Sequence, residues 1–427
     1  MKKKLLIMSL WLSLGLVCSC GKSGEQASEE QPVYHIPTSR EETVQTSMES
    51  SVESGIGDGE SVEGTKDDTS DVEVFEGEAF FADFEGVGAY ETTAANTSDF
   101  RNAIMSSIVC KDEQGTIYYV NYGTYEDNYI YAYKDGVSSL LVDKICNFIN
   151  FYEDSLYFLV SETPPDWLAF SWAGKLYRYD LASGETELVL DENVCNLYVA
   201  DGRMYFCDEL RVGSDEKVYG GDWHSMKIGD ARPERMGRLL PFFYGDYQLA
   251  YSEEEKIGCL VLTDGEEDIP ITRESYLGNN HYTIIGDTLW LSARTEEGTA
   301  AVAAVNLADG THKWYPATAY TPSGGMMVTN IGLDYAIIDN RIYAVSQSGI
   351  LAYDENQGCF DKFVFDSTAY TGLYTDGESL YGLACYGIPF EYHTNGIVKI
   401  TPNPEDGQIG QITLDSEYRE VISEGGK

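Results

Sequence analysis

The sequence predicts an all-β protein whose larger part is a β-propeller, and three observations support this. Short segments in which aliphatic and aromatic residues follow a polar turn recur at steps of about 37 to 53 residues. The chain has 42 Gly and 32 Tyr against only 12 Pro, a composition that suits strands joined by tight turns. Most copies are followed by two more strand-like stretches and preceded by an apolar one, so the repeating unit has four strands.

The first segment, residues 1–19, has the features of an export signal. "MKKK" is a positively charged start, and "LLIMSLWLSLGLV" is an apolar run too short to span a bilayer. The following "VCSC" resembles a bacterial lipobox, and this resemblance implies that Cys20 carries lipid and becomes the mature N-terminus. The alternative is an ordinary secretory signal with a chance cysteine. Two or three acyl chains would hold the protein stably at a membrane, so we expect an extracytoplasmic protein bound to the membrane through this lipid only.

Residues 20–75 are expected to form a disordered acidic tether. Ser, Glu, Gly and Thr dominate this stretch, and acidic residues far outnumber Lys22, Arg40 and Lys66. Residues 76–103 are transitional, and their Phe80, Phe81 and Phe84 could either dock on the following domain or lie outside it.

Residues 104–422 hold the repeat. We expect seven four-stranded blades, with six as the alternative count, because a four-stranded sheet can bury both faces only against its neighbours in a closed ring. Matching aromatic residues should wedge between the blades: Tyr118, Tyr157, Tyr205, Trp290, Tyr343 and Tyr381. The repeated segment occurs seven times, and each copy contains the turn and the start of the second strand of one blade. The copies are "QGTIYYVNY", "EDSLYFLVS", "DGRMYFCDE", "GDYQLAYSE", "GDTLWLSAR", "DNRIYAVSQ" and "DGESLYGLA". The fourth copy is the least regular, because Gln248 and Leu249 are out of phase with the others.

The stretches "GDTLWLS", "DSLYFL" and "GKLYRYDLASGETELVL", with "NTSDFRNA" ahead of the first unit, carry a family resemblance. Over about residues 96–416 the chain resembles a bacterial propeller domain of unknown function that is related to low-density-lipoprotein-receptor-type propellers. The resemblance implies the fold and a place in secreted or lipid-anchored bacterial proteins, and it supplies no catalytic residues.

The charge excludes one class of partner. The formal net charge is −43, and phosphate backbones are bound by clustered Lys and Arg, so we expect no nucleic acid to bind. Catalytic and metal-binding motifs are also missing from the sequence: it has no H-E-x-x-H, no G-x-S-x-G, no P-loop and no C-x-x-C. We therefore predict no cofactor, no metal and no catalytic residue.

Seven cysteines follow Cys20, and most are expected to be small buried apolar residues. Cys195 and Cys207 lie six residues on either side of Asp201. They are therefore expected to face each other across a hairpin, and a disulfide between them is an alternative.

Long connections between the second and third strands distinguish blades 7, 1, 2 and 3, which neighbour one another in a closed ring. These loops are rich in aromatic residues, which give rigid contact area to protein and glycan surfaces. The alternative is that the loops fold over the blade tops and bury their own aromatic side chains. We predict ligand contacts from Trp167, Phe170, Trp172, Tyr219, Trp223, Tyr386, Phe390 and Tyr392.

The sequence thus favours a non-catalytic, monomeric binding or scaffold module at the cell surface, with a protein or a cell-wall glycan as partner. The alternative function is a glycan-active hydrolase or lyase with carboxylates at the mouth of the propeller channel.

Overall fold

The computed structural model describes residues 80–91, 108–120, 128–161, 173–208, 211–212, 218–219, 221–252, 259–273, 282–294, 300–320, 326–328, 335–346, 349–362, 369–385, 394–402 and 409–413. The signal, Cys20 and the tether lie outside these residues, as do the predicted domain limits at 104 and 422. The regular elements in the described ranges are all strands, and none of these ranges contains a helix long and apolar enough to cross a membrane.

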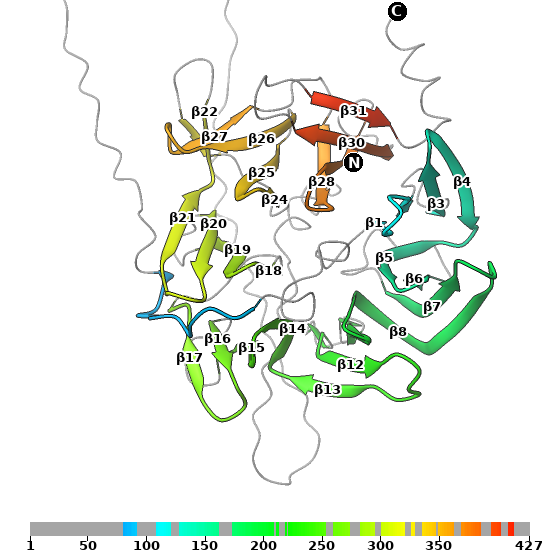
Figure 1. Cartoon of the computed structure of the whole chain (residues 1–427), viewed down its shortest axis with the longest axis horizontal. Coiled ribbons are helices and arrows are strands. Elements are labelled where there is room, and N and C mark those ends of the chain that lie inside the picture. Colours follow the sequence, from blue (N-terminus) through cyan, green and yellow to red (C-terminus); the bar gives the residue numbers. More distant parts are fainter. Residues whose placement is uncertain are drawn as a thin grey trace, which may run out of the picture.

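The protein is an all-β propeller. Its strands form mainly antiparallel sheets around a centre, and within each successive group of four strands the first lies inside while the fourth lies outside (Figure 1). We call each group of four strands a unit. Unit 1 contains β1 (Val109–Lys111), β2 (Ile117–Val120), β3 (Ile130–Lys134) and β4 (Val137–Val142). Unit 2 contains β5 (Cys146–Tyr152), β6 (Ser155–Val160), β7 (Gly174–Asp180) and the first part of β8 (Thr186–Ala200). Unit 3 contains the second part of β8, β9 (Arg203–Asp208), β12 (Trp223–Lys227) and β13 (Glu234–Gly237).

The remaining units follow in chain order. Unit 4 contains β14 (Leu239–Tyr244), β15 (Tyr247–Tyr251), β16 (Leu260–Thr263) and β17 (Asp268–Pro270). Unit 5 contains β18 (Tyr282–Ile285), β19 (Thr288–Arg294), β20 (Ala300–Asn306) and β21 (His312–Pro316). Unit 6 contains β24 (Tyr335–Ile338), β25 (Arg341–Ser346), β26 (Gly349–Asp354) and β27 (Cys359–Lys362). Unit 7 contains β28 (Ala369–Thr375), β29 (Leu380–Cys385), β30 (Thr394–Pro402) and β31 (Ile409–Thr413). The number of blades that close the ring stays a prediction.

Two departures from the simple repeat alter the sheets. The single strand β8 ends unit 2 and begins unit 3, so these units share one seven-stranded sheet. Between units 5 and 6 the chain forms an extra hairpin of β22 (Thr318–Tyr320) and β23 (Met326–Val328). In this hairpin β22 pairs with β27 in parallel, which covers the outer edge of unit 6.

Tight turns join the first two strands of the units. In unit 3 the turn residues Asp201 and Gly202 have φ of 48° and 70°, and in unit 6 Asp339 and Asn340 have φ of 49° and 61°. Positive φ at both central residues is the type I′ geometry, whose twist matches that of the flanking strands. Asp, Asn and Gly tolerate this region best, which explains the polar turn ahead of each copy of the repeat.

Aromatic residues fill the junctions between units, as predicted. All six matching aromatic side chains are buried, and the buried clusters that contain them draw residues from neighbouring units. Tyr381 of unit 7, for example, lies in one cluster with Tyr118 of unit 1 and Phe158 of unit 2. The hydrophobic effect therefore stabilises the contacts between neighbouring units.

Asn150 of β5 adds a polar tie between units 2 and 3. Its Nδ2 donates hydrogen bonds to the carbonyl oxygens of Phe148 (2.9 Å) and Leu197 (3.1 Å). Its Oδ1 accepts one from the amide of Val199 at 3.1 Å, and the residue is fully buried. Phe148 has a φ of 51° at a bulge in β5, so the side chain of Asn150 satisfies backbone groups in the irregular part of this strand.

We expect Asn150→Leu to lower the free energy of unfolding by about 2–4 kcal/mol, because the leucine leaves buried backbone groups without partners. Denaturant titration monitored by tryptophan fluorescence measures this change. The control Asn356→Leu, at an exposed turn, is expected to change stability by less than about 0.5 kcal/mol. Equal midpoints for the two variants would contradict the role given to Asn150.

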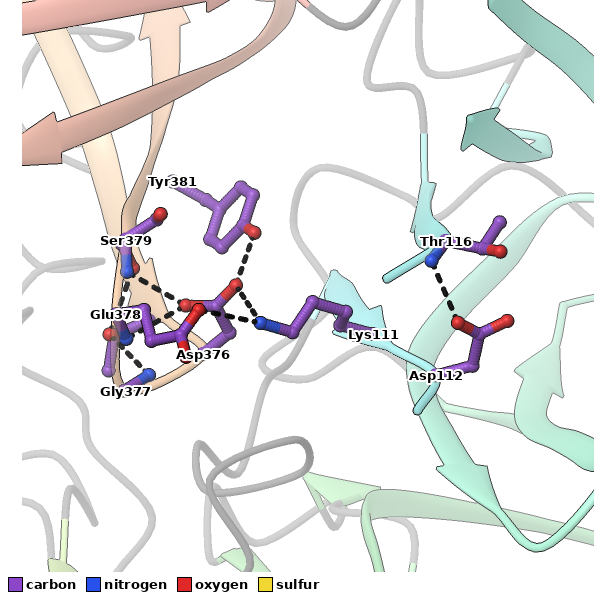
Figure 2. A network of polar contacts seen from close by, with 9 residues as sticks. Lys111, Asp112, Thr116, Asp376, Gly377, Glu378, Ser379 and Tyr381 are labelled. Carbon is purple, nitrogen blue, oxygen red and sulfur yellow. Dashed lines mark hydrogen bonds and ion pairs between the residues drawn. The ribbon is translucent and has the colours of Figure 1, made fainter. Parts of the chain in front are cut away.

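The last unit contacts the first through a network of polar side chains (Figure 2). Lys111 of β1 places its Nζ 2.9 Å from Oδ2 of Asp376, and 3.4 Å from Oε2 of Glu378. The same Asp376 oxygen accepts a 2.6 Å hydrogen bond from the hydroxyl of Tyr381. Its Oδ1 accepts the amides of Glu378 (3.0 Å) and Ser379 (2.8 Å) in the turn between β28 and β29. Side chains therefore join the two ends of the ring, and unit 7 takes its four strands from one continuous stretch of chain.

Residues 80–91, which we call the strap, dock on units 4 and 5. The amide of Ala82 donates to the carbonyl of Ile271 (2.9 Å), and the amide of Val87 donates to that of Leu307 (2.8 Å). Phe80, Phe81 and Phe84 are buried in one cluster with side chains of units 3, 4 and 5. The sequence left two alternatives open for these three residues, docking on the domain or lying outside it. The structure shows docking.

Glycine permits the close approach of the strap to unit 5. A Cβ at Gly310 would lie only 2.1 Å from the carbonyl oxygen of Phe84, and one at Gly86 only 2.4 Å from that of Ala308. Both glycines also have positive φ, so any side chain there would displace the strap.

Candidate functional site

The candidate site lies on the face where the second strand of each unit connects to the third, which we call the loop face. Unit 3 departs most from the repeat here. Between β9 and β12 the chain forms a separate hairpin of β10 (Arg211–Val212) and β11 (Val218–Tyr219). At its base the amide of Asp208 donates to the carbonyl of Asp222 (3.1 Å), and Gly221 donates back to Asp208 (3.2 Å). Two backbone hydrogen bonds therefore close the base of this connection.

A histidine and a carboxylate meet at this base. The Nε2 atom of His224 lies 3.0 Å from Oδ1 of Asp208, a contact that becomes an ion pair when the imidazole is protonated. The imidazole stacks on Phe206, with ring centroids 6.1 Å apart and planes 10° from parallel. Strand pairing brings the two rings together, because His224 is the cross-strand partner of Phe206 in the β9–β12 pair.

A second carboxylate lies beside them. Oδ2 of Asp222 accepts a 2.6 Å hydrogen bond from Nη2 of Arg235, which lies on β13. Oδ1 of Asp222 is buried and has no hydrogen-bond partner within the described ranges. A buried carboxylate oxygen in this state is an acceptor for an N–H or O–H group of a ligand or of water. We call Asp208, Asp222, His224 and Arg235 the unit 3 cluster.

The first unit contributes another buried polar group on the same face. Asn128 precedes β3, and its carbonyl oxygen accepts the amide of Cys146 in unit 2 at 2.8 Å. Its side chain is buried, and neither amide atom has a partner among the described residues. The loop face thus carries buried hydrogen-bonding groups at units 1 and 3.

The described residues place few groups for catalysis or metal binding. They hold no set of three or more His, Cys, Asp or Glu side chains arranged to bind a metal ion. Burial raises the pKa of the Cys146 thiol, so it stays protonated and is a poor nucleophile. The arrangement of the unit 3 cluster therefore suits hydrogen bonding to a ligand and the support of a loop.

Only two of the eight predicted contact residues can be located. Tyr219 lies in β11, opposite Arg211. Trp223 is the first residue of β12, is 1% exposed and belongs to the core shared by units 3, 4 and 5, so its prediction as a surface contact is corrected. The regular strand begins at this residue and turns the indole inward, whereas the sequence pattern had placed it in the loop. The other six lie outside the described residues: Trp167, Phe170, Trp172, Tyr386, Phe390 and Tyr392.

The two cysteines that the sequence singled out are cross-strand partners in the β8–β9 pair. Neither forms a disulfide and both are buried, and Sγ of Cys195 donates to the carbonyl of Asp208 at 3.3 Å. Their role in the structure is therefore to fill the core of unit 3.

The sequence did not predict the unit 3 cluster. Its one signal was the length of the connection after Cys207, which exceeds that in most other units. The partners Asp208 and Arg235 gave no signal, because charged residues are frequent throughout this chain.

Comparisons with known proteins give similarity at the level of shape only. No protein-family model and no curated protein match the chain. An acylaminoacyl peptidase of Pyrococcus horikoshii is similar at 12% identity and a TM-score of 0.45, over 77% of this chain and 55% of that one. A puromycin-hydrolyzing peptidase of Mycobacterium tuberculosis is similar at 9% and 0.43, over 78% and 56%. BamB of Moraxella catarrhalis is similar at 13% and 0.37, over 64% and 80%.

The chain spans little more than half the length of the two peptidases. All three TM-scores are below 0.5, so the assignment depends on the strands themselves. By the order and pairing of those strands, the chain is an all-β propeller.

Proposed function

We propose that the protein is a lipid-anchored propeller at the cell surface, and that it binds a protein or glycan partner through its loop face without catalysis. One observation carries the proposal: the second-to-third-strand connection of unit 3 forms its own hairpin on a fixed polar base. A hairpin added to the four-stranded unit can supply contact area for a partner.

The unit 3 cluster supports binding in a second way. Asp222 offers a buried, unpartnered oxygen, and Asn128 offers a buried amide on the same face. Groups of this kind favour ligands that complete their hydrogen bonds, and both glycan hydroxyls and peptide amides do so. The sequence also has aromatic residues in the loops of units 2 and 7. In the order of the units around the ring, unit 2 lies between units 1 and 3, and unit 7 is next to unit 1.

The partner is expected to be retained by aromatic contacts. The triple variant Trp167→Ala, Trp172→Ala and Tyr219→Ala should reduce retention of the full-length chain on isolated cell-wall glycan, or on surface-protein fractions, by at least about tenfold. Trp223 is left intact, because its replacement would damage the core. The variant Leu188→Ala, at an exposed position of the outer rim, is the control and should bind as the parent does. Unchanged binding by a folded triple variant would refute the proposal.

The anchor is tested separately. If Cys20 carries lipid, Cys20→Ala should move the protein from the membrane fraction to the medium and abolish labelling by an alkyne fatty acid. Cys18→Ser, two residues earlier, should leave both properties unchanged. Labelling that persists in the Cys20 variant would overturn this part of the proposal. The resemblance to a bacterial propeller domain related to low-density-lipoprotein-receptor-type propellers does not depend on this result.

The glycan-active enzyme remains the second candidate, favoured by the contact of His224 with Asp208 beside Asp222. Turnover of a glycan by the parent, lost in Asp208→Asn and Asp222→Asn, would select it over a binding module.

A further inference from the structure

The outer strands of a propeller have one free edge, and most outer strands here are protected. Charged residues, proline or a covering strand prevent such edges from pairing with other chains. The protected strands are β13 with Glu234 and Arg235, β17 with Asp268 and Pro270, β21 with Lys313 and Pro316, and β27 beneath β22. The outer part of β8 carries Glu187.

Strand β4 has none of these features. Its sequence, "VSSLLV", contains no charge and no proline in a chain of net charge −43. It ends the sheet of unit 1, and no other described strand pairs with its outer edge. Among the other described strands that end a sheet on the outside, β23, "MMV", and β31, "IGQIT" in the neighbouring unit 7, are also without charge.

The exposed apolar side chains lie on the same part of the rim. Among the described residues the large exposed hydrophobics are Val137 (66% exposed), Leu140 (50%) and Leu188 (46%). The first two are in β4, and Leu188 is in the outer part of β8 in unit 2 (Figure 1). Because acidic residues are so frequent elsewhere, the uncharged strand β4 with its exposed Val137 and Leu140 is a distinct surface feature.

The backbone of β4 has the geometry of an edge strand among the described residues. Asp135 and Gly136, with φ of 52° and 83°, form the tight turn that sets its register against β3, with Lys134 opposite Val137. In an antiparallel pair, hydrogen-bonded and non-bonded positions alternate. Every second residue of β4 therefore directs its N–H and C=O away from β3, which is the arrangement that β-augmentation uses.

Charge decides which kind of strand fits. A second copy of this chain brings the same net charge of −43 and is repelled at long range, whereas a basic protein is attracted. The exposed carboxylates of Asp135 and Asp143 stand at the two ends of β4, each beside a lysine, so the edge itself is locally balanced. The uncharged middle then favours apolar side chains at alternate positions.

We propose that the outer edge of β4 pairs with an extended segment of a basic partner protein, in which apolar residues alternate and Lys or Arg flank the paired stretch. This surface lies on the rim, so it is separate from the loop face and does not depend on the function proposed there.

The test uses the full-length chain and a synthetic seven-residue peptide, with lysine at both ends and valine alternating with threonine between them. We expect the peptide to bind, as measured by fluorescence anisotropy, and to slow hydrogen exchange of β4 amides at least about tenfold. Leu140→Lys should weaken binding at least tenfold, because it places a charge on the edge. The matched control Leu188→Lys adds the same charge on the next outer strand and should leave the affinity within about twofold.

Two further probes separate the contributions. N-methylation of alternate peptide amides should abolish binding, because it removes the donors that would pair with β4. Glutamates in place of the terminal lysines should weaken binding, most of all at low salt. The proposal is overturned by any of three results: no binding, equal effects of Leu140→Lys and Leu188→Lys, or a dimer of the parent chain that Leu140→Lys dissociates. The last result would assign the edge to a second copy.

Discussion

Replacing Phe80 by alanine is expected to lower the free energy of unfolding by about 3–5 kcal/mol, the usual cost of truncating a fully buried aromatic side chain. Phe80 is 0% exposed, and its ring lies 5.2 Å from that of Trp314 and 5.3 Å from that of Phe81, centroid to centroid. It therefore packs the strap against unit 5 itself. Thermal and denaturant unfolding of the purified chain measure the loss.

The same substitution at Phe75 is the control. It lies five residues earlier, in the segment that the sequence predicts to be a disordered tether, and Phe75→Ala should be neutral to within about 0.5 kcal/mol. A chain truncated to begin at residue 76 should keep the stability of the parent, whereas one that begins at residue 92 lacks the strap and should be far less stable. Equal stability of these two truncations would show that the strap is dispensable.

Asp376→Ala is expected to cost a similar amount, about 3–5 kcal/mol, because it removes one partner of a nearly buried ion pair. The carboxylate is 4% exposed, and its loss would leave Lys111 and the hydroxyl of Tyr381 without their shared acceptor. It would also leave two amides of the β28–β29 turn unbonded. Since Lys111 belongs to unit 1, the loss falls on the contact between the ends of the ring.

Two controls separate ring closure from turn formation. Glu378→Gln removes an exposed partner of Lys111 and should cost less than about 1 kcal/mol, as exposed ion pairs do. Asp264→Ala alters a turn in unit 4 in which Oδ1 likewise accepts two amides, both from residues of the same turn. A loss of stability in Asp264→Ala as large as that in Asp376→Ala would attribute the effect to the turn alone.

The same contact should make stability depend on pH. Burial by itself would raise the pKa of Asp376, but hydrogen bonds from Tyr381, Lys111 and the turn amides hold that pKa below its usual range. A carboxyl whose folded pKa is lowered stabilises the protein above its unfolded pKa of about 3.9, and this contribution is lost as the pH falls through the folded value. The parent should therefore lose more stability than Asp376→Asn between about pH 5 and pH 3.

Much of the fold could be predicted because the repeat is local. Alternation of apolar residues after a turn gives a strand directly, and "DGRMYFCDE" becomes β9 as expected. The irregular fourth copy also becomes a strand, β15, because a shift of register in β14 accommodates it. There Leu249 is buried, and the Nε2 of Gln248 donates to the carbonyl of Leu240 at 2.8 Å.

Contacts between distant parts of the chain could not be predicted in this way. Periodicity gives the spacing within a unit, but it does not say that Phe80 packs on unit 5 or that Lys111 meets Asp376. The continuity of β8 was hidden for a related reason, since "DENV" resembles a polar break between strands and the pairing carries the strand through it.

In the candidate site, too, the local pattern could be predicted and the contacts between distant residues could not. The unusual connection of unit 3 was visible as extra length, which identified where to look. The pairing of His224 with Asp208, and the burial of Trp223, depend on which residue begins β12, and boundaries of strands are the weakest part of any sequence pattern.

The docking of the strap also determines how the propeller would respond to mechanical force. A pull on the chain ahead of Phe80 would first load the hydrogen bonds from Ala82 to Ile271 and from Arg273 to Phe80, and only then reach β1. Units 4 and 5 would take up the tension, so the first strand of the ring would be shielded from being peeled away. A tethered propeller built this way should unravel from its strap, at a force that the three buried phenylalanines set.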